Sequence, residues 1–380
     1  MGARGKSFSR AEGEFMRRAL ALAERGYGGT SPNPMVGAVL VRNGEIIGEG
    51  WHKRAGEAHA EVNAIAAARR NVSHLHGASL FVTLEPCSTT GRTGACTGAI
   101  LESGIAEVIV AARDPNPEHS GKGFSLLRKA GVRVRTGLLE AEANRLNEAF
   151  NHWIVRRSPW VVLKCAMSLD GKIATNSGES KWITGEKARG TGMKLRLGAD
   201  AILVGINTVL RDDPALTLRP APGLKIPAWK RVKRIVLDPE ARISKAARVI
   251  AEEQAAETIV VVTRRAPKER IALLGKVVRV LVAPTLRDGR RINLRWLLEK
   301  LGSEEITSVL VEGGGETHAN FFRQDLVRRA YFFYASLIIT GRRAPKAVGG
   351  ARTMRPPFKL KEVEWNKVGG DLLCSGLVGR

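Results

Sequence analysis

One histidine, one glutamate and two cysteines have the residue types and spacing of a metal-dependent hydrolytic site. His59 and Glu61 stand two positions apart, Cys87 follows a proline, and Cys96 comes nine positions later. One imidazole and two thiolates give a zinc ion three protein ligands, so the fourth tetrahedral position can hold a water whose pKa falls towards neutrality. Glu61 is then free to carry protons. We predict that His59, Cys87 and Cys96 hold Zn²⁺ and that Glu61 is catalytic.

The surrounding sequence predicts the elements that such a site needs. Residues 58–68 are rich in good helix formers with apolar spacing, so His59 opens a predicted helix. Residues 78–84 are an apolar, β-favouring run that ends just before Pro86-Cys87. Zinc nucleobase deaminases use this His-x-Glu and Pro-Cys pattern. The alternative is that the two cysteines are ordinary buried thiols and His59 is a surface residue.

The spacing between the two cysteines departs from the usual Cys-x-x-Cys. Residues 88–95 separate them, which is too long for one tight turn and indicates an inserted loop that contacts substrate. The other histidines offer no second metal spacing, and we expect them to be surface or capping residues: His52, His74, His76, His119, His152 and His318.

Length and composition predict two domains in a reducing compartment. A chain of 380 residues exceeds the size at which one core keeps growing, and we place a zinc-dependent domain at 1–150, a linker at 151–157 and a second domain at 158–380. No run of about 18 uncharged apolar residues occurs, so we expect no membrane association. Four cysteines, two of them committed to metal, indicate a cytoplasmic protein.

The positive charge is concentrated away from the zinc motif. The formal net charge is +24, yet residues 1–150 hold 19 basic and 15 acidic side chains, whereas 151–380 hold 42 and 22. The excess occurs as scattered pairs such as Arg264-Arg265 and Arg290-Arg291 rather than as one stripe. A solvated basic surface is therefore favoured over a polynucleotide site, and no nucleic-acid partner is expected.

In the first half, strands and helices alternate. Ser9-Arg10-Ala11-Glu12 reads as a capping box that opens a helix to about Arg25. Asn43-Gly44 favours a hairpin between strands at 35–41 and 46–48. The remaining predictions are a strand at 108–111, a helix at 124–130, a strand at 132–134 and a helix at 138–150. This order indicates a three-layer α/β domain.

The second half is also predicted to be α/β. Strands are expected at 160–167, 201–204, 234–237, 258–262 and 308–311, with helices near 186–197, 294–301 and 317–324. Val311-Glu312-Gly313-Gly314-Gly315 follows one strand and opens a helix, where backbone amides can approach phosphate. Residues 204–214 add polar groups beyond another strand. Two such turns on one sheet suggest a nucleotide crevice.

Taken together, these segments resemble the bifunctional riboflavin-biosynthesis deaminase-reductase family over about residues 9–345. The first half is similar to its pyrimidine deaminase domain in segments 30–37, 59–62, 83–87, 91–93 with Cys96, and 114–117. The second half is similar to its reductase domain in segments 168–174, 180–184, 204–205 with Thr208, 212–214, 216–219 and 311–314.

The resemblance implies a fold and two reactions. It implies a cytidine-deaminase-like domain followed by a dihydrofolate-reductase-like α/β domain. It also implies zinc-dependent deamination of a phosphoribosylated aminopyrimidine, then NADPH-dependent reduction of its ribosyl group to ribityl. A homo-oligomer is expected.

The resemblance also places residues at the two sites. At the reductase substrate it places Ser180, Arg196, Leu216, Arg219 and Glu312. At NADPH it places Ala166, Trp182, Thr208, Asp212, and Gly314, Gly315 and Asn320 of the Gly-rich turn. Asn33 is expected either to hydrogen-bond the pyrimidine edge or only to shape a turn between two prolines.

Some of these roles have structural alternatives. Arg196 and Arg219 could form bidentate contacts with a phosphate, or they could pair with local carboxylates. Trp182 could cover the cofactor or belong to the core.

Two competing functions remain open from the sequence. One is a zinc deaminase acting on a nucleic-acid base, with a basic carboxy-terminal binding module. It predicts aromatic stacking residues near the zinc loop, and the loop has none. In the other, residues 151–380 are a non-catalytic assembly module.

Overall fold

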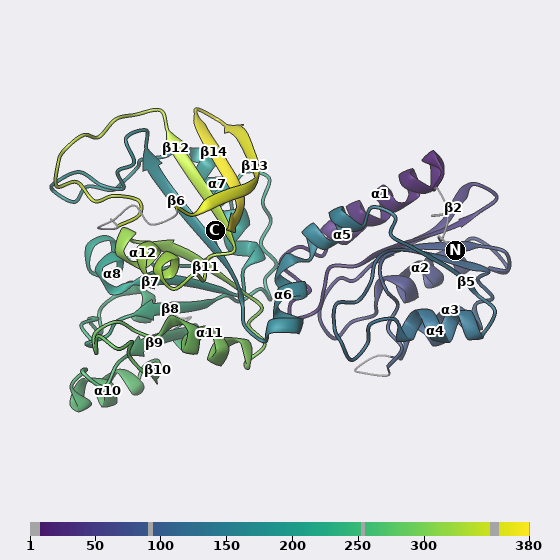
Figure 1. The fold of residues 1–380 in the computed structure, drawn as a ribbon, viewed down its shortest axis with the longest axis horizontal. Coiled ribbons are helices and arrows are strands. Elements are labelled where there is room, and N and C mark those ends of the chain that lie inside the picture. The colour runs from purple at the N-terminus through teal and green to yellow at the C-terminus, as the bar shows by residue number, and fades with distance from the viewer. Residues whose placement is uncertain (1–7, 90–93, 252–254, 350–356, 380) are drawn as a thin grey trace. The chain divides into compact units, whose positions relative to one another are not determined.

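The protein is described by a computed structural model that covers residues 8–89, 94–251, 255–349 and 357–379. It divides into two compact units, Met1–Arg157 and Ser158–Arg380, each of them α/β (Figure 1). Residues 151–156 of the expected linker at 151–157 belong to the last helix of the first unit. Within the described residues, no helix is both long and apolar enough to cross a bilayer.

The first unit is built on a five-stranded sheet in the order β2-β1-β3-β4-β5. β1 pairs antiparallel with β2 and with β3, whereas β3, β4 and β5 are parallel. Its elements are α1 (Arg10–Glu24), β1 (Gly37–Arg42), β2 (Glu45–Trp51), α2 (Ala60–Arg69), β3 (Ser79–Leu84), α3 (Cys96–Glu102), β4 (Glu107–Ala112), α4 (Lys122–Lys129), β5 (Arg133–Thr136), α5 (Glu140–Leu146) and α6 (Glu148–Arg156).

Helices cover both faces of this sheet, as the three-layer prediction requires. α1 and α5 lie on one face, and α2, α3 and α4 lie on the other (Figure 1). The predicted capping box is confirmed, because the Ser9 hydroxyl accepts from Glu12 N and the Glu12 carboxylate accepts from Ser9 N. The hairpin at Asn43-Gly44 is also confirmed.

The single helix predicted at 138–150 is wrong. The structure divides it at Asn147, which has a non-helical backbone between α5 and α6. The Asn147 side chain accepts from Met35 N at 2.8 Å and donates to Met35 O at 2.9 Å. These two hydrogen bonds tie the break to the start of β1, and helical periodicity alone cannot reveal such a distant contact.

The second unit holds a nine-stranded sheet in the order β10-β9-β8-β7-β11-β6-β12-β14-β13. The strands from β10 to β12 are parallel, and β14 and β13 close the sheet with antiparallel pairs. The elements are β6 (Trp160–Ser168), α7 (Glu186–Gly198), β7 (Ala201–Gly205), α8 (Ile206–Asp212), β8 (Lys233–Leu237), α9 (Arg248–Ala251), η1 (Ala255–Glu257), β9 (Thr258–Val262), α10 (Lys268–Gly275), β10 (Arg279–Val282), α11 (Leu294–Gly302), β11 (Ser308–Gly313), α12 (Gly315–Arg323), β12 (Arg329–Ala335), β13 (Lys359–Val368) and β14 (Asp371–Gly379).

The central strands of this sheet are buried on both faces. Along β7, Leu203 packs in one cluster with α11 and α12, whereas Ile202 and Val204 pack in another with α8, α9 and α10. This alternation explains why these strands read as continuous apolar runs. The strands after β11 were not predicted. β13 is mostly exposed and lacks such a run, whereas β12 and β14 were missed although they are largely buried.

Candidate active sites

The proposed zinc ligands come from three different elements and meet at one point. His59 caps α2, Cys87 follows β3, and Cys96 opens α3. His59 Nδ1 lies 3.2 Å from Cys96 Sγ and 3.6 Å from Cys87 Sγ. The three ligand atoms lie within 4.8 Å of one another. The β3–loop–α3 connection therefore brings the cysteines together although eight residues separate them in sequence.

This donor set fits zinc. Tetrahedral coordination with Zn–S near 2.3 Å and Zn–N near 2.0–2.1 Å places neighbouring ligand atoms about 3.5–3.8 Å apart. The observed nitrogen-to-sulfur distances of 3.2 and 3.6 Å are close to that spacing. Three protein ligands leave a fourth position for a small molecule, which is the arrangement of catalytic rather than structural zinc sites.

Hydrogen bonds to the flanking segments hold the ligands in place. The Asn63 side chain donates to Trp51 O at 2.9 Å and to Ala58 O at 3.1 Å, which joins the start of α2 to the end of β2. Cys96 N donates to Cys87 Sγ at 3.3 Å. The buried Glu85 carboxylate accepts from Gly121 N at 3.0 Å and Gly123 N at 3.1 Å, so it ties the segment before Cys87 to the start of α4.

The titratable groups around the cluster are strongly perturbed. Burial raises the pKa of the Glu61 carboxyl to about 7, and the charge of Cys87 adds to this effect. A hydrogen bond with Cys96 lowers the pKa of the Cys87 thiol, and the same contact raises that of Cys96. A divalent cation between the sulfurs would stabilise both thiolates, so metal binding would release a proton.

The structure corrects the expectation for His52. It is not a surface residue but is only 2% exposed. Its ring packs edge-on against the His59 ring with centroids 5.2 Å apart. The Asn33 amide nitrogen lies 3.1 Å from His52 Nε2. Asn33 therefore contacts His52, and His52 packs against the proposed zinc ligand His59. His52 directly follows β2, and the predicted strand ended too early, at residue 48, to reveal this.

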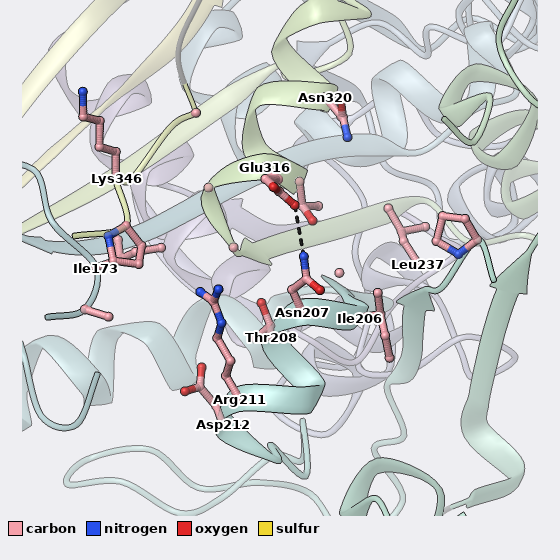
Figure 2. Close-up of a pocket in the computed structure, with 18 of the residues that line it drawn as sticks. Ile173, Ile206, Asn207, Thr208, Arg211, Asp212, Leu237, Glu316, Asn320 and Lys346 are labelled. Carbon is pink, nitrogen blue, oxygen red and sulfur yellow. Dashed lines mark hydrogen bonds between the residues drawn. The ribbon is translucent and has the colours of Figure 1, made fainter. Parts of the chain in front are cut away.

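The second unit contains a cavity of about 450 Å³ beside the carboxyl ends of β7, β8 and β11. Figure 2 shows Thr208, Arg211 and Asp212 on α8, Asn320 on α12 and Leu237 at the end of β8. This location is where open α/β sheets bind ligands. The volume lies within the range of about 300–1,000 Å³ that small-molecule and cofactor sites occupy.

Glycines let two turns approach each other closely around this cavity. A Cβ on Gly315 would lie 2.1 Å from Lys346 O, and one on Gly205 would lie 2.4 Å from Thr317 Oγ1. The amino end of α12 thus faces the cavity without side chains at Gly314 or Gly315. Such a bare turn at a helix start suits a phosphate group, so the cavity fits a phosphorylated cofactor.

Arg196 and Glu312 form a buried ion pair outside the cavity lining. Arg196 Nε donates to Glu312 Oε1 at 2.8 Å, and Nη2 donates to Oε2 at 2.6 Å. Arg196 Nη1 also donates to Thr217 O at 2.9 Å. Burial raises the pKa of the Glu312 carboxyl, but the charge and hydrogen bonds of Arg196, together with the charges of Lys164 and His318, lower it overall. Arg196 was expected either to bind a phosphate or to pair with a local carboxylate. In the structure it pairs with the carboxylate of Glu312.

Comparisons with known proteins match the two units separately and together. Residues 9–112 match the cytidine and deoxycytidylate deaminase zinc-binding region, and residues 159–374 match the RibD C-terminal domain. The chain is 42% identical to the riboflavin biosynthesis protein RibD of Aquifex aeolicus, over 94% of this chain and 96% of that protein. The chain belongs to the RibD family.

Solved RibD structures share this fold. Acinetobacter baumannii RibD has a TM-score of 0.85 at 33% identity, covering 98% of this chain and 99% of that one. A Thermotoga maritima diaminohydroxyphosphoribosylaminopyrimidine deaminase/5-amino-6-(5-phosphoribosylamino)uracil reductase has a TM-score of 0.82 at 36% identity, covering 97% and 99%. The cytidine-deaminase-like and reductase folds expected from the sequence are thus confirmed. The chain is a zinc-dependent deaminase and an NADPH-dependent reductase of riboflavin biosynthesis.

Not all residues predicted for the reductase site of this RibD-family chain lie together. Six of them line the cavity: Ser180, Thr208, Asp212, Gly314, Gly315 and Asn320. Ser180 Oγ donates to Asp212 Oδ1 at 2.8 Å. Leu216 is buried, whereas Arg219 is exposed and Trp182 is 67% exposed, with the Arg189 guanidinium over its ring. Trp182 is therefore not a core residue.

Sequence reasoning missed several groups around the reductase site. His318 was expected at the surface but is 1% exposed on α12, and its Nδ1 lies 2.8 Å from Ala347 O. Asn207 and Arg242 line the cavity and contact each other. Arg242 had no signal in the sequence beyond its place shortly after a predicted strand. Gly91, Arg92 and Thr93 of the deaminase loop lie outside the described residues, so the predicted substrate contact of residues 88–95 stays a prediction.

Proposed function

We propose that the two sites act in succession on one phosphoribosylated aminopyrimidine. The first reaction is hydrolytic deamination of 2,5-diamino-6-(5-phosphoribosylamino)pyrimidin-4(3H)-one. The second is reduction of the ribosyl side chain to ribityl. The meeting of His59, Cys87 and Cys96 beside buried Glu61 is the observation that carries this proposal.

In the deaminase unit, His59, Cys87 and Cys96 would hold the zinc ion. When bound, zinc supplies a water that is nucleophilic near neutral pH. Glu61 carries two protons in turn at its carboxylate: the first goes from the attacking water to the ring nitrogen, and the second goes from the hydroxyl formed by the attack to the departing ammonia. Asn33 hydrogen-bonds the pyrimidine edge through its amide, which His52 orients.

In the reductase unit, the cavity beside β7, β8 and β11 would hold NADPH, which supplies the hydride for C1′. Thr208, Asp212, Gly314, Gly315 and Asn320 contact the cofactor, with Ala166 and Trp182 at its edges. Ser180, whose hydroxyl donates to Asp212, and Glu312, held ionised by Arg196, accept hydrogen bonds from the ribose hydroxyls. Arg219 binds the substrate phosphate, and Leu216 borders it.

A coupled assay on the full-length chain tests this proposal. With the diamino substrate and NADPH, ammonia release should precede NADPH oxidation, and the two amounts should match. A chelated chain should do neither on this substrate, yet should oxidise NADPH when given the deaminated compound. Release of ammonia without any NADPH oxidation on either compound would refute the bifunctional proposal.

The proposal includes a cellular setting. All four cysteines are free thiols, which is typical of proteins in a reducing compartment, so we place the chain in the cytoplasm. A homo-oligomer without a nucleic-acid partner remains our expectation.

A further inference from the structure

Cations outnumber carboxylates in the lining of the reductase cavity. The cationic side chains are Arg211, Arg242, Arg290, Arg291 and Lys346, and the carboxylates are Asp212 and Glu316. A cavity with this balance favours a ligand that carries several negative charges. If the proposed reductase function holds, that ligand is NADPH, with a pyrophosphate and a separate phosphate on the 2′ position of its adenosine ribose.

The cations fall into two groups at different places along the sheet. Arg211 lies on α8, and Lys346 lies in a segment bound to the residues after β6 through Ile173 N and Pro345 O, 2.9 Å apart. Arg242, Arg290 and Arg291 instead follow β8 or precede α11. β8 lies two strands beyond β11, which carries Glu312. The elements that carry the second group therefore lie on the β8–β10 side of the sheet, away from Glu312.

The backbone around Arg242 is fixed from two sides. Asp238 is fully buried, and its Oδ2 accepts from Ile243 N at 2.8 Å. Arg270 Nη2 donates to Ile243 O at 2.9 Å, and its Nε donates to Ala241 O. The short loop after β8 thus presents Arg242 at a defined position rather than on a mobile arm.

Asn207 directs the Arg242 guanidinium towards the cavity. Arg242 Nη2 donates to Asn207 Oδ1 at 2.8 Å, and Asn207 Nδ2 donates to Glu316 Oε2 at 3.1 Å (Figure 2 shows the second bond). The Asn207 amide therefore hydrogen-bonds to both the Glu316 carboxylate and one nitrogen of the Arg242 guanidinium. The other donors of Arg242 remain available to a ligand.

Among the described residues, two of the arginines at this end form no ion pair within salt-bridge distance. In the part of the chain that the structure describes, neither Arg242 nor Arg290 forms an ion pair, whereas Arg291 pairs with Asp288. An arginine in a cavity with unused donors is suited to a phosphate, because its planar fork can make two parallel hydrogen bonds to phosphate oxygens.

We propose that Arg242 and Arg290 bind the 2′-phosphate of NADPH and make the reductase prefer NADPH over NADH. The two dinucleotides differ only in this phosphate, so discrimination must come from groups that meet it. The proposal rests on the reductase function above and adds the residues that select the cofactor.

Dinucleotide affinity tests this assignment without relying on turnover. Dissociation constants for NADPH and NADH are measured from nicotinamide fluorescence on the full-length chain. The variants are Arg242→Ala, Arg290→Ala and the double variant. Arg265→Ala is the matched control, because Arg265 lies in a nearby loop, pairs with exposed Glu240 at 3.1 Å and does not line the cavity.

We expect each single variant to weaken NADPH binding about tenfold and the double variant about 100-fold, since charge-assisted hydrogen bonds are worth roughly a factor of ten or more each. NADH affinity should change less than twofold, and Arg265→Ala should change neither. The probe 2′,5′-ADP should compete with NADPH on the wild-type chain and lose that ability in the double variant.

Several results would overturn the assignment. Unchanged NADPH affinity in Arg290→Ala and Arg242→Ala would do so, as would an equal fall in NADPH and NADH affinity in a variant whose unfolding temperature is unchanged. The Arg290 side chain makes no hydrogen bond or ion pair in the described ranges. Arg290→Ala should therefore fold normally, so a change in its NADPH affinity reports on binding. Equal affinity of the wild-type chain for NADPH and NADH would refute the assignment of Arg242 and Arg290 but not the reductase function. A wild-type chain that binds neither would refute the reductase function as well.

Discussion

At the scale of single residues, we propose that Glu61 moves protons without binding metal. It lies on the first turn of α2, two positions after His59, and is 3% exposed. Burial keeps bulk water away from its carboxylate, so a proton taken there is passed to the substrate rather than to solvent. Its role is therefore separable from that of the three ligands.

Replacing Glu61 should remove catalysis and leave the metal. We expect Glu61→Gln to lower the rate of ammonia release by about 10²–10⁴-fold, because proton transfer by a positioned side chain typically contributes that much. Zinc content per chain, measured by elemental analysis, should not change. NADPH oxidation with the deaminated compound serves as the control and should keep its wild-type rate. Wild-type ammonia release by the variant would exclude the proposed role.

The Arg196–Glu312 pair makes a second prediction at this scale, on stability against pH. Because the pKa of Glu312 is lowered in the folded chain, the pair contributes stability above the unfolded value of about 4.3, and this contribution is lost as pH falls through the lower folded pKa. Glu312→Gln should cost about 3 kcal/mol at neutral pH, since it leaves Arg196 buried without its partner. The cost should shrink in acid.

Denaturant unfolding of the second unit at several pH values measures this effect. The matched control is Glu304→Gln in the exposed Arg279–Glu304 pair, where the loss should stay below about 1 kcal/mol. A penalty for Glu312→Gln that does not depend on pH would contradict the assigned ionisation.

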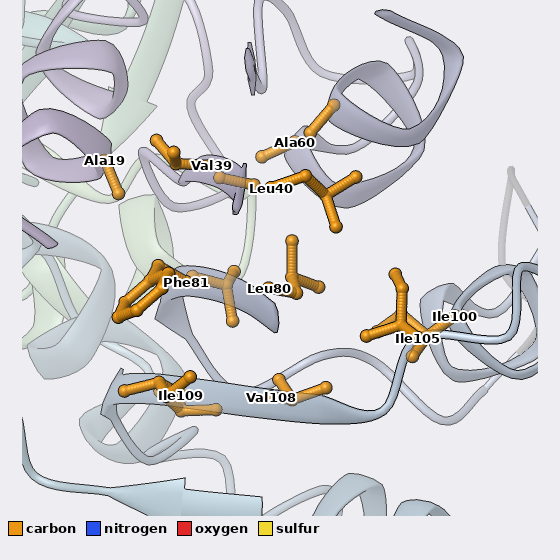
Figure 3. Close-up of a cluster of buried hydrophobic side chains, with 14 of the residues drawn as sticks. Ala19, Val39, Leu40, Ala60, Leu80, Phe81, Ile100, Ile105, Val108 and Ile109 are labelled. Atoms are coloured by element: carbon orange, nitrogen blue, oxygen red, sulfur yellow. The ribbon is translucent and has the colours of Figure 1, made fainter. Parts of the chain in front are cut away.

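At the scale of elements, the zinc site depends on how closely α2 packs on β2. Gly48 and Gly50 leave no side chain between strand and helix, and a Cβ on Gly50 would lie 2.4 Å from both Ala60 O and Ala64 N. Ala60 also packs in the core of the same sheet with Leu40 and Leu80, so this face of the helix is held against the sheet (Figure 3). A shift of α2 would therefore move His59 and Glu61 together.

Gly50→Ala should damage the metal site from a distance. We expect a loss of about 1–3 kcal/mol in unfolding free energy from overpacking, together with weaker zinc binding as α2 is displaced. Gly98→Ala on α3 is the control, because its Cβ would meet nothing within 4 Å and alanine favours a helix by up to about 1 kcal/mol. Competition with a chelator measures zinc affinity, and equal affinity in the two variants would argue against this coupling.

Elements with strong local signals could be predicted from the sequence, and those that depend on distant contacts could not. The Ser9 capping box and the Asn43-Gly44 hairpin use interactions within a few residues. The break at Asn147 depends on Met35, far away in sequence. The zinc ligands were predictable because metal chemistry restricts their types and spacing. His52 and Arg242 were not, since their roles come from neighbours that only the fold supplies.

At the scale of the whole molecule, the two units have separate hydrophobic cores. The clusters in Met1–Arg157 share no residue with those in Ser158–Arg380. Each unit also has its own proposed ligand, zinc in the first and NADPH in the second. Because a ligand stabilises the folded form that binds it, we expect each ligand to stabilise its own unit.

Thermal unfolding should therefore show two transitions that respond to different ligands. Removing zinc should lower the unfolding temperature of the first unit by several degrees and leave the unfolding temperature of the second unit unchanged. Adding NADPH at about 100 times its dissociation constant should stabilise the second by about 2.7 kcal/mol. Calorimetry measures both shifts, and a single transition that moves with either ligand would contradict independent cores.

The most direct test is to measure ammonia release from the diamino substrate before and after the metal is stripped. Zinc is then added back in known amounts, and the release is measured again. We expect one zinc per chain, loss of ammonia release when the metal is stripped, and recovery with one equivalent of zinc. Cys87→Ser and Cys96→Ser should fail to recover. Full ammonia release from a chain shown to hold no metal would contradict the account.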